Sequence, residues 1–396
     1  MGRLQAKMEM EDQKESPPAE RVGALYLHVP FCSAKCRYCD FYSVPAEADP
    51  CRRYLRALNC EAEQRLGLLD PPADSVFVGG GTPTALETND LAELLALAGA
   101  RAGSNTEFSV EANPGTLNTE KIGVLVSAGV NRVNLGVQSF DDAELEALGR
   151  IHNAKEAREA FNMLRQAGLQ NLGLDLIYGI PGQSPRSWQT SLAEALSLEP
   201  EHLSCYALSF EKGTPLWSDL QQGRVGEMDE TEQEACWYHA IRSAGAAGLA
   251  QYEISNFARP GRQCRHNMTY WRNMPYLGLG PGAASYVRGV RRTNLPNLEA
   301  YSDALLAGQD TPCSQEHLTG REAMAETVML ALRMTEGLDL AGFKARYGQD
   351  VRNVFRQSLD KHLQTGWLKL AEGRLRIPVP AMFVSNEVLA DILAEA

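Results

Sequence analysis

The stretch "YLHVPFCSAKCRYCDF", residues 26–41, places three cysteines within eight positions, directly after a short apolar run. Cys32, Cys36 and Cys39 have the spacing C-x3-C-x2-C. Thiolates are soft ligands that suit iron-sulfur clusters and zinc, and such sites are usually held by four of them. With only three thiols at hand, each can hold one iron of a [4Fe-4S] cluster. The fourth iron is then open to an exogenous ligand.

Two alternative roles for the three cysteines stay open at this point. One is a zinc site completed by a distant ligand such as Cys264 or His266, and the second is that they are three unrelated buried thiols. Zinc knuckles favour C-x2-C pairs, and no second pair occurs. Disulfides explain the cluster poorly, because the nine cysteines are odd in number and residues 1–20 lack the apolar run of a secretory signal. We therefore expect a reducing, cytoplasmic location.

Six β-rich runs follow one another along the chain, separated by segments whose apolar residues recur every three or four positions. The runs are ALYLHV (24–29), SVFVGGG (75–81), EFSVEAN (107–113), RVNLGVQS (132–139), LGLDLIYG (172–179) and HLSCYALS (202–209). Strands that alternate with helices of this length favour right-handed βαβ units and a parallel sheet. The expected fold class is α/β, as a doubly wound sheet or as a complete or partial barrel.

Polar residues gather near the C-terminal ends of these predicted strands. They are the run from Gly79 to Thr84, together with Glu111, Gln138 and Asp175. Parallel sheets and barrels assemble their binding sites at this edge, since the loops that follow the strands meet there. The sequence therefore predicts one common pocket.

The alternation stops near residue 210. Residues 228–248 predict a helix that opens with Asp229 and Glu232 spaced like a capping box, and a polar, glycine-punctuated region with few regular elements follows over 251–285. From residue 311 helical patterns precede a hairpin, WLKLAEGRLRI, that turns at Glu372 and Gly373. Helices followed by a hairpin favour a smaller, winged-helix-like α+β domain over residues 311–396. We expect residues 1–20 to form a disordered tail.

Composition limits the partners. The formal net charge of -12 argues against a surface that neutralises nucleic-acid phosphates, so a nucleic-acid role for the C-terminal domain is the weakest alternative. No run of 18 apolar residues occurs, so we expect at most peripheral contact with a membrane.

Several motifs together give the chain a family resemblance. "YLHVPFCSAKCRYCDF", "VGGGTPT", "SVEANPGT", "GVNRVNLGVQSF" and "LDLIYGIPGQ" resemble the radical S-adenosylmethionine (SAM) superfamily. Within it they are similar to the branch that contains oxygen-independent coproporphyrinogen III oxidase (HemN) and the haem chaperones of the HemW group. The resemblance implies a partial (β/α)6 barrel, with a radical SAM core and its extension over residues 21–310. A HemN-type C-terminal domain would follow over 311–396.

The resemblance also implies cofactors and their ligands. Cys32, Cys36 and Cys39 would hold the [4Fe-4S] cluster, and SAM would chelate its open iron through the amino and carboxylate groups. The implied SAM contacts are Tyr26, Tyr38, Gly80, Gly81, Thr82, Glu111, Gln138, Arg150 and Asp175. These residue types suit the task, since glycines let backbone approach a ligand closely and an arginine can clamp a carboxylate.

Two features favour the HemW group over the oxidase. The oxidase pattern has a fourth cysteine where this chain has Phe41, and the segments YEISNFA (252–258) and HNMTYW (266–271) resemble HemW signatures. The second signature implies haem as a cofactor, with His266 as the iron ligand and Tyr270 and Trp271 as flat faces for the porphyrin. Cys264 is a second candidate ligand. The alternative is that His266 is a hydrogen-bonded structural histidine between core aromatics.

Two functions therefore compete. The first is a haem chaperone that binds [4Fe-4S], SAM and haem and delivers haem to haemoproteins such as respiratory enzymes. The second is a radical SAM enzyme that acts on a porphyrinogen or porphyrin, as an oxidoreductase of the HemN type or as a methyltransferase. Decarboxylation of coproporphyrinogen is disfavoured by Phe41. A homodimer joined through its cofactors is compatible with both functions.

Overall fold

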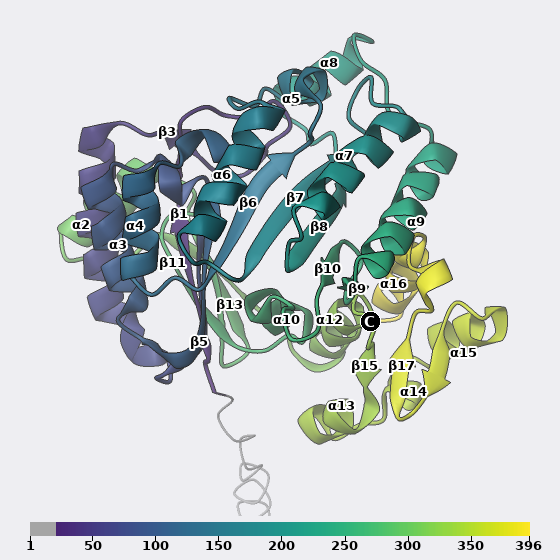
Figure 1. Cartoon of the computed structure of the whole chain (residues 1–396). Coiled ribbons are helices and arrows are strands. Elements are labelled where there is room, and N and C mark those ends of the chain that lie inside the picture. Colours follow the sequence, from purple (N-terminus) through teal and green to yellow (C-terminus); the bar gives the residue numbers. More distant parts are fainter. Residues whose placement is uncertain (1–20) are drawn as a thin grey trace, which may run out of the picture.

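The computed structural model describes residues 21–396, so the expected tail over residues 1–20 lies outside the described residues. Six parallel strands form its centre and lie side by side in chain order (Figure 1). They are β1 (Ala24–Val29), β4 (Ala73–Gly80), β5 (Ala102–Ala112), β6 (Arg132–Gln138), β7 (Leu172–Tyr178) and β8 (His202–Ala207). The predicted partial (β/α)6 barrel is confirmed.

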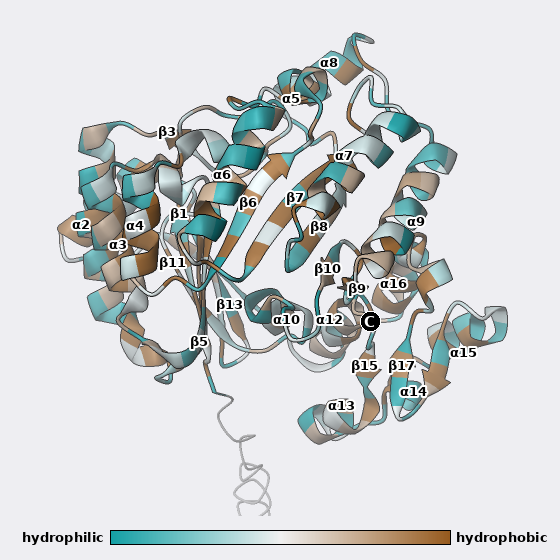
Figure 2. Ribbon diagram, in the orientation of Figure 1, coloured by the Kyte–Doolittle hydropathy of each residue, from teal (hydrophilic) through white to brown (hydrophobic). Residues whose placement is uncertain are grey.

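Helices cover the outer surface of this sheet (Figure 1). The principal ones are α2 (Ala48–Arg65), α3 (Thr88–Gly99), α4 (Thr119–Ser127), α6 (Ala154–Gln166), α7 (Pro185–Ser197) and α9 (Glu230–Ala246). Capping side chains fix where some of these helices begin. Asn153 and Glu156 form a capping box on α6, and Ser184 caps α7 directly before a proline. Figure 2 shows hydrophobic residues along β6 and β7 and mainly hydrophilic residues on the outer side of α6.

The strands are apolar toward the helices and polar toward the interior of the barrel. On β7, Leu172, Leu174 and Leu176 are buried in the main hydrophobic core, whereas Asp175 and Ile177 line an internal cavity. The same alternation places Asn134 and Gly136 of β6 on the inner face, because successive side chains of a strand point to opposite sides. The polar lining of the barrel interior therefore follows from the alternation of side chains along each strand.

The helix predicted over residues 228–248 is confirmed by α9, but residues 251–285 contain more regular structure than expected, so the prediction of few elements there is wrong. One edge of the sheet gains β11 (Tyr276–Leu279), which runs parallel to β1, followed by β12 (Ala284–Val287), β13 (Val290–Asn294) and β14 (Cys313–His317). The other edge gains β10 (Asn256–Ala258) and β9 (Ala250–Gln251), both antiparallel additions. These strands are short, and they form by pairing with an existing edge rather than by their own pattern.

The C-terminal unit has the predicted winged-helix-like arrangement. Its elements are α12 (Gly320–Ala331), β15 (Leu338–Asp339), α13 (Leu340–Tyr347), α14 (Val351–Val354), α15 (Arg356–Thr365), β16 (Lys369–Ala371), β17 (Arg374–Arg376) and α16 (Ser385–Ala394). The hairpin turns at Glu372 and Gly373, both of which have positive φ, as a tight two-residue turn requires. The division at residue 311 remains a prediction.

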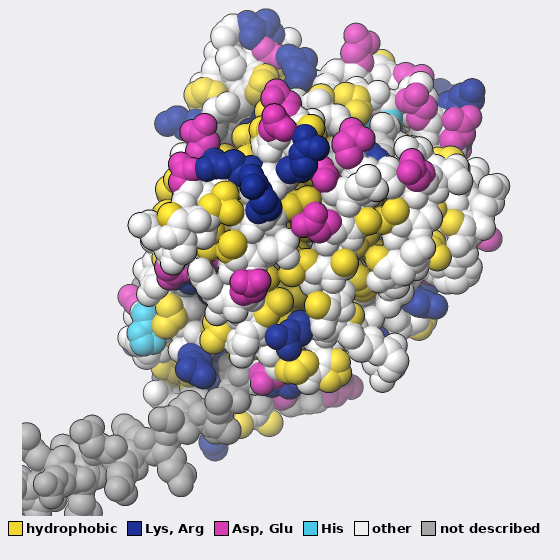
Figure 3. Space-filling view, turned by 90° about the vertical axis from the view of Figure 1, so that its left-hand side faces the viewer, with side chains coloured by type: hydrophobic (Ala, Val, Ile, Leu, Met, Phe, Trp, Pro, Cys, Tyr) yellow, Lys and Arg dark blue, Asp and Glu magenta, His cyan; other side chains and the backbone are white. Residues whose placement is uncertain are grey.

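Two surface properties bear on partners. On the face shown in Figure 3, Lys and Arg side chains are interspersed with Asp and Glu and form no continuous basic surface. None of the helices within residues 21–396 has both the length and the apolarity needed to cross a bilayer.

Candidate cofactor-binding site

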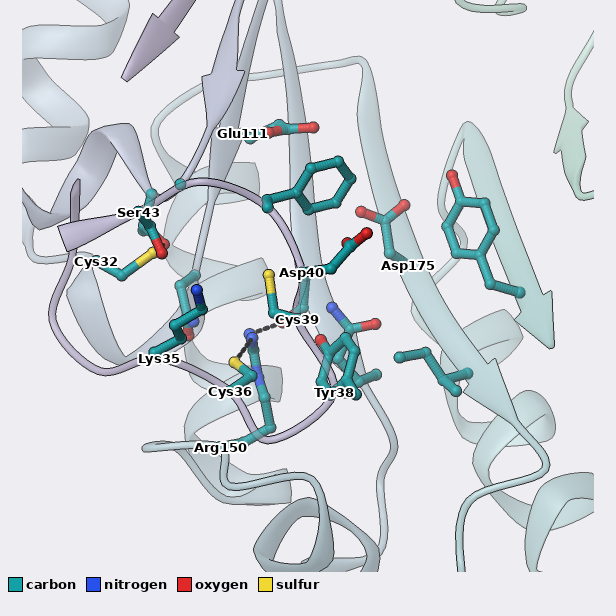
Figure 4. A pocket seen from close by; sticks show the side chains of 18 of the residues that line it. Cys32, Lys35, Cys36, Tyr38, Cys39, Asp40, Ser43, Glu111, Arg150 and Asp175 are labelled. Carbon is teal, nitrogen blue, oxygen red and sulfur yellow. Dashed lines mark hydrogen bonds between the residues drawn. The ribbon is translucent and has the colours of Figure 1, made fainter. Parts of the chain in front are cut away.

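A cavity of about 510 Å³ opens at the C-terminal ends of the barrel strands (Figure 4). It is lined by eleven of the predicted site residues: Cys32, Cys36, Tyr38, Cys39, Gly80, Gly81, Thr82, Glu111, Gln138, Arg150 and Asp175. Tyr26 and His266 do not line it. The predicted common pocket therefore exists.

The cysteine loop leaves the barrel after β1 through the two-residue strand β2 (Phe31–Cys32). All three thiols are partly exposed, and burial and the neighbouring thiols raise the pKa of Cys39. Arg150 Nη1 donates to Cys36 Sγ at 3.1 Å, and Cys32 Sγ lies 3.7 Å from the Thr82 hydroxyl. Partly exposed thiols on one loop, with a guanidinium in hydrogen-bonding contact with one of them, fit the anchor of a cluster.

Within residues 21–396, no three His, Cys, Asp or Glu side chains converge as the ligands of one metal ion do. A cube takes each thiolate at a different iron, so its cysteines need not converge on one point. The zinc alternative is not supported, because its fourth ligands lie at the other end of the barrel. His266 contacts Ser75 at the start of β4, five residues before Gly80 at the cavity, and a strand of that length spans roughly 16 Å.

The glycine run forms a backbone cradle at the cavity wall, because a side chain at Gly80 or Gly81 would clash with the protein itself. Gly80 has a φ of 108°, and a Cβ there would lie 2.5 Å from Nδ1 of His28. A Cβ on Gly81 would lie 2.5 Å from the carbonyl oxygen of Phe31. The Gly80 N–H donates to Glu111 Oε2 at 2.9 Å. Backbone is thus presented directly to the cavity, as close approach to a ligand requires.

Two carboxylates lie deep on the inner face of the barrel and still face the cavity. Burial and the nearby Asp175 raise the pKa of Glu111 to about 7, although its hydrogen bond from Gly80 opposes this. Burial also raises the pKa of Asp175, against the opposing effects of Ser204, Arg132 and Arg150. Asp175 Oδ1 has no hydrogen-bond partner among the described residues. A buried acceptor left unpaired is costly in the free protein and is ready for a donor from a ligand, such as a ribose hydroxyl.

Gln138 reaches the cavity from a strained backbone. It has a φ of 72°, and the pairing of β6 with β7 shifts register between Gly136 and Gln138, which marks a β-bulge. Two side chains hold the bulge: Arg150 Nη2 donates to the Gly136 carbonyl at 2.5 Å, and His152 Nε2 lies 3.1 Å from the Val137 carbonyl. A non-glycine residue in this region persists only where its surroundings enforce it.

His152 is thus a positioning residue that sequence reasoning missed. Burial and the charge of Arg150 lower its pKa to about 4, so the imidazole is neutral. Nε2 donates to the Val137 carbonyl, and Nδ1 lies 3.1 Å from the side-chain amide of Asn113, which itself lines the cavity. The sequence around His152 does not predict that it supports the backbone of β6, since this role depends on the bulge between Gly136 and Gln138.

Tyr26 lies beneath the cavity. Its hydroxyl is 3.0 Å from Nδ1 of His28, and its ring packs against Phe77 and His266. Tyr26 does not line the cavity in this structure, and its contact with SAM remains a prediction. Tyr26 instead supports His28, the side chain that lies under Gly80.

His266 lies in α10 (Arg265–Trp271) and is 1% exposed. Its Nδ1 is 3.0 Å from the Ser75 hydroxyl, its Nε2 is 2.8 Å from the Tyr270 hydroxyl, and burial lowers its pKa to about 3. Arg333 covers the ring of Trp271 at 5.0 Å. Both nitrogens of His266 are therefore engaged, so ligation by His266 would require α10 to open. Tyr270 and Trp271 are half-buried, and Trp271 Nε1 has no partner among the described residues. In this structure it is a structural histidine.

Cys264, the second candidate haem ligand, is also closed off. Its thiol lies 3.6 Å from Glu107 Oε1, and it is completely buried. The same carboxylate accepts the backbone N–H groups of Arg265 and His266 at 2.8 and 3.3 Å. Glu107 thereby fixes the start of α10 against the N-terminal end of the barrel.

Several further residues line the cavity without having been predicted. They are Phe41, Asn134, Ile177, Tyr206 and Leu208, together with Lys35 on the cysteine loop. Strand period is the signal that could have found some of them, since Asn134 and Ile177 lie an even number of positions from Gln138 and Asp175. Phe41 and Leu208 follow from loop paths that the sequence does not fix.

Comparisons with known proteins agree with this site. The model of the radical SAM superfamily matches residues 26–195, and that of the HemN C-terminal domain matches residues 318–384. The heme chaperone HemW of Bacillus subtilis is 37% identical over 94% of this chain and 100% of its own length. HemW of Escherichia coli is 32% identical over 94% and 98%. Coproporphyrinogen III oxidase (HemN) from Escherichia coli has the same fold, with a TM-score of 0.82 at 20% identity over 99% of this chain and 94% of that one.

Proposed function

This chain belongs to the HemW family of heme chaperones within the radical SAM superfamily, and from that premise we propose that it binds a [4Fe-4S] cluster, SAM and haem and passes haem to acceptor haemoproteins. One observation supports the cofactor part most strongly. Three partly exposed thiols, a glycine cradle and an unpaired buried carboxylate face the same cavity.

Different residues of the cavity would hold the cluster and SAM. Cys32, Cys36 and Cys39 would hold three corners of the cluster. A cluster with one open iron, once SAM is bound to it, supplies one-electron chemistry to the site. Gly80 and Gly81 let the amino end of SAM approach the backbone, and this part of the cavity excludes bulk because any side chain there would clash.

The charged residues would orient the rest of the ligand. Arg150 keeps a guanidinium between Cys36 and the bulge of β6, and its Nε is buried without a partner among the described residues, which suits a carboxylate. Asp175 and Glu111 offer acceptors for hydroxyl or amino groups. Since the pKa of Glu111 is raised to about 7, its carboxylate can gain or lose a proton near neutral pH.

A second function remains in competition because eight of the nine implied SAM contacts, all except Tyr26, line the cavity. A carrier that only holds haem would not require Arg150, Asp175 and the glycine cradle. The alternative is therefore a radical SAM enzyme that acts on a porphyrin or porphyrinogen. Phe41, which stands where the oxidase pattern has its fourth cysteine, counts against decarboxylation of coproporphyrinogen.

One anaerobic experiment separates the two functions. Protein with a reconstituted cluster is loaded with haem and SAM, mixed with a haem-free acceptor, and followed for haem transfer and for release of 5'-deoxyadenosine. We expect transfer of haem without stoichiometric release of the nucleoside. Release coupled to a changed porphyrin product would favour the enzyme, and the absence of saturable haem binding would reject the chaperone.

The partners follow from the same proposal. We infer acceptors among respiratory enzymes, reached from the cytoplasm with at most peripheral contact at the membrane. A homodimer joined through cofactors is part of this inference as well. Haem transfer to a panel of haem-free respiratory and non-respiratory proteins tests the choice of acceptor, and equal transfer to all of them would remove the respiratory preference.

A further inference from the structure

Apolar residues surround the mouth of the cofactor cavity. Phe41, on the cysteine loop, is 64% exposed, and no other large apolar side chain within residues 21–396 is as exposed. Tyr206, which is 40% exposed, and Leu208 follow β8 on another wall of the same cavity, and Ile177 lies on neighbouring β7. We call Phe41, Ile177, Tyr206 and Leu208 the apolar rim. Single exposed apolar residues are ordinary, but here two exposed residues, Phe41 and Tyr206, line one cavity together with half-buried Leu208 and with Ile177, which is 5% exposed, and the four form a surface for a ligand.

The size of the cavity limits what it can enclose. A volume of about 510 Å³ suits one small ligand of the size of a nucleoside derivative next to a cluster. A tetrapyrrole does not fit inside together with them. A flat macrocycle can, however, lie across the opening, where its face meets the apolar rim and the ring of Phe41.

Charge at the mouth is mixed. Lys35 lines the cavity, and no ion pair ties its ammonium to another described residue, so it is available to a ligand carboxylate. Asp40 and Glu211 line the same opening and carry the opposite charge. The apolar contact with the rim therefore has to supply most of the binding, and Lys35 would orient one carboxylate of the ligand. Figure 4 shows Lys35, Asp40 and the three cysteines around this opening.

At α10, which the sequence suggested for haem, the candidate iron ligands are closed off. Both ring nitrogens of His266 are hydrogen-bonded, Cys264 is completely buried, and Arg333 lies over the half-buried ring of Trp271. A ligand as large as haem would have to displace α10 from the barrel to reach His266 or Cys264. At the rim, in contrast, Phe41 and Tyr206 are exposed as they stand, and Leu208 is half-buried.

We propose that haem docks across the mouth of the cofactor cavity, with one face on the apolar rim and a propionate near Lys35, rather than at α10. This inference rests on the proposed haem chaperone function and specifies its site. It also implies that haem and the cluster-SAM site share one opening, so that haem covers the cavity when it is bound.

The test is an anaerobic titration of full-length, cluster-loaded protein with ferric haem, followed by visible absorption, with SAM affinity measured separately. Phe41→Ser should weaken haem binding about fivefold, because an aromatic contact contributes about 1 kcal/mol beyond area burial. Phe41→Tyr should restore it. Leu370→Ser is the matched control, since Leu370 is 44% exposed on the hairpin of the C-terminal unit.

Several outcomes are decisive. Unchanged haem affinity in Phe41→Ser, or a loss of SAM affinity in place of haem affinity, overturns the rim as the haem site. If Phe41→Ser fails to retain its cluster, Leu208→Ser on the opposite wall provides the same comparison, and unchanged haem affinity there overturns the rim equally. Failure of the unaltered protein to bind haem at all rejects the proposed function itself, which distinguishes the two failures.

Discussion

The two ends of the barrel differ in what their buried polar side chains face. At the C-terminal end, Asp175 has an oxygen that lines a cavity without a hydrogen bond from any described residue, and Gln138 has a strained backbone. At the N-terminal end, both nitrogens of His266 are bonded, and Glu107 receives three donors from the start of α10. Unpaired atoms occur there too, on Arg132 and Trp271, but these residues do not line the cavity. A missing partner therefore points to a ligand site only where the unpaired atom also faces a cavity.

The largest effect should come from the cysteine loop. Cys36→Ala should abolish assembly of the cluster and its visible absorption, because two thiolates cannot anchor the cube. Cys60→Ala, which changes a cysteine of α2 outside the cavity, is the control and should leave the absorption intact. Iron and sulfide analysis after anaerobic reconstitution measures both. A normal cluster in Cys36→Ala would remove the basis for the cofactor site.

Asp175→Asn should weaken SAM binding roughly 10- to 100-fold, the range expected when a charged hydrogen-bonding partner is lost. It should also stabilise the ligand-free protein at neutral pH. Burial raises the pKa of Asp175, so ionisation costs free energy in the folded state above that pKa, and a neutral amide removes the cost. Asp360→Asn, an exposed change on α15, is the control. Calorimetry and thermal unfolding measure the two effects, and a loss of stability would contradict the account.

Glu111 should give SAM binding a pH dependence. With a pKa of about 7, its carboxylate is mostly ionised at about pH 8 and mostly protonated at about pH 6, so SAM affinity should fall about tenfold over that range. The stability of the ligand-free protein should change in the other direction. A folded pKa raised above the unfolded value makes the folded state take up a proton first as the pH falls, so the free energy of unfolding rises. Glu111→Gln should abolish both trends.

His152→Ala should weaken SAM binding about fivefold and leave the cluster content unchanged. Loss of the imidazole frees the Val137 carbonyl and lets the strained Gln138 relax, which costs the site about 1 kcal/mol of preorganisation. His152→Gln keeps a donor and should recover part of the affinity. A variant that binds SAM normally would show that the bulge needs no such support.

His266→Gln should have the smallest effect on cofactors: haem affinity should change less than about twofold. The free energy of unfolding should fall by about 2 kcal/mol, since Ser75 and Tyr270 lose well-placed partners in a buried site. Haem titration measures the affinity, and thermal unfolding measures the stability. A large loss of haem affinity with little loss of stability would restore His266 as the iron ligand.

The sequence predicts the barrel well because the period of its strands and helices is strong. It predicts the cavity residues well because Glu111, Gln138, Arg150 and Asp175 follow from strand ends and family motifs. It does not reveal the hydrogen bonds of His266, since one imidazole looks the same in a sequence whether its nitrogens are free or bonded.

The additions to the sheet edges were missed for a different reason. β13 and β14 are half-buried or exposed and carry no alternating pattern, so their conformation depends on the neighbouring strand. The positions of His152 and Phe41 likewise depend on tertiary context: the first on a bulge in β6, and the second on the path of the cysteine loop. Non-local pairing leaves no local signature in the chain.

The central claim is that three thiols leave one corner of a cluster open toward the glycine cradle. Electron-nuclear double resonance on the reduced, anaerobic protein tests it directly, with SAM carrying a nitrogen label in its amino group. We predict a hyperfine coupling between the cluster and the labelled nitrogen, which Asp175→Asn weakens and Cys60→Ala leaves unchanged. A cluster with four protein ligands, or one that shows no coupling when SAM is saturating, would contradict the account.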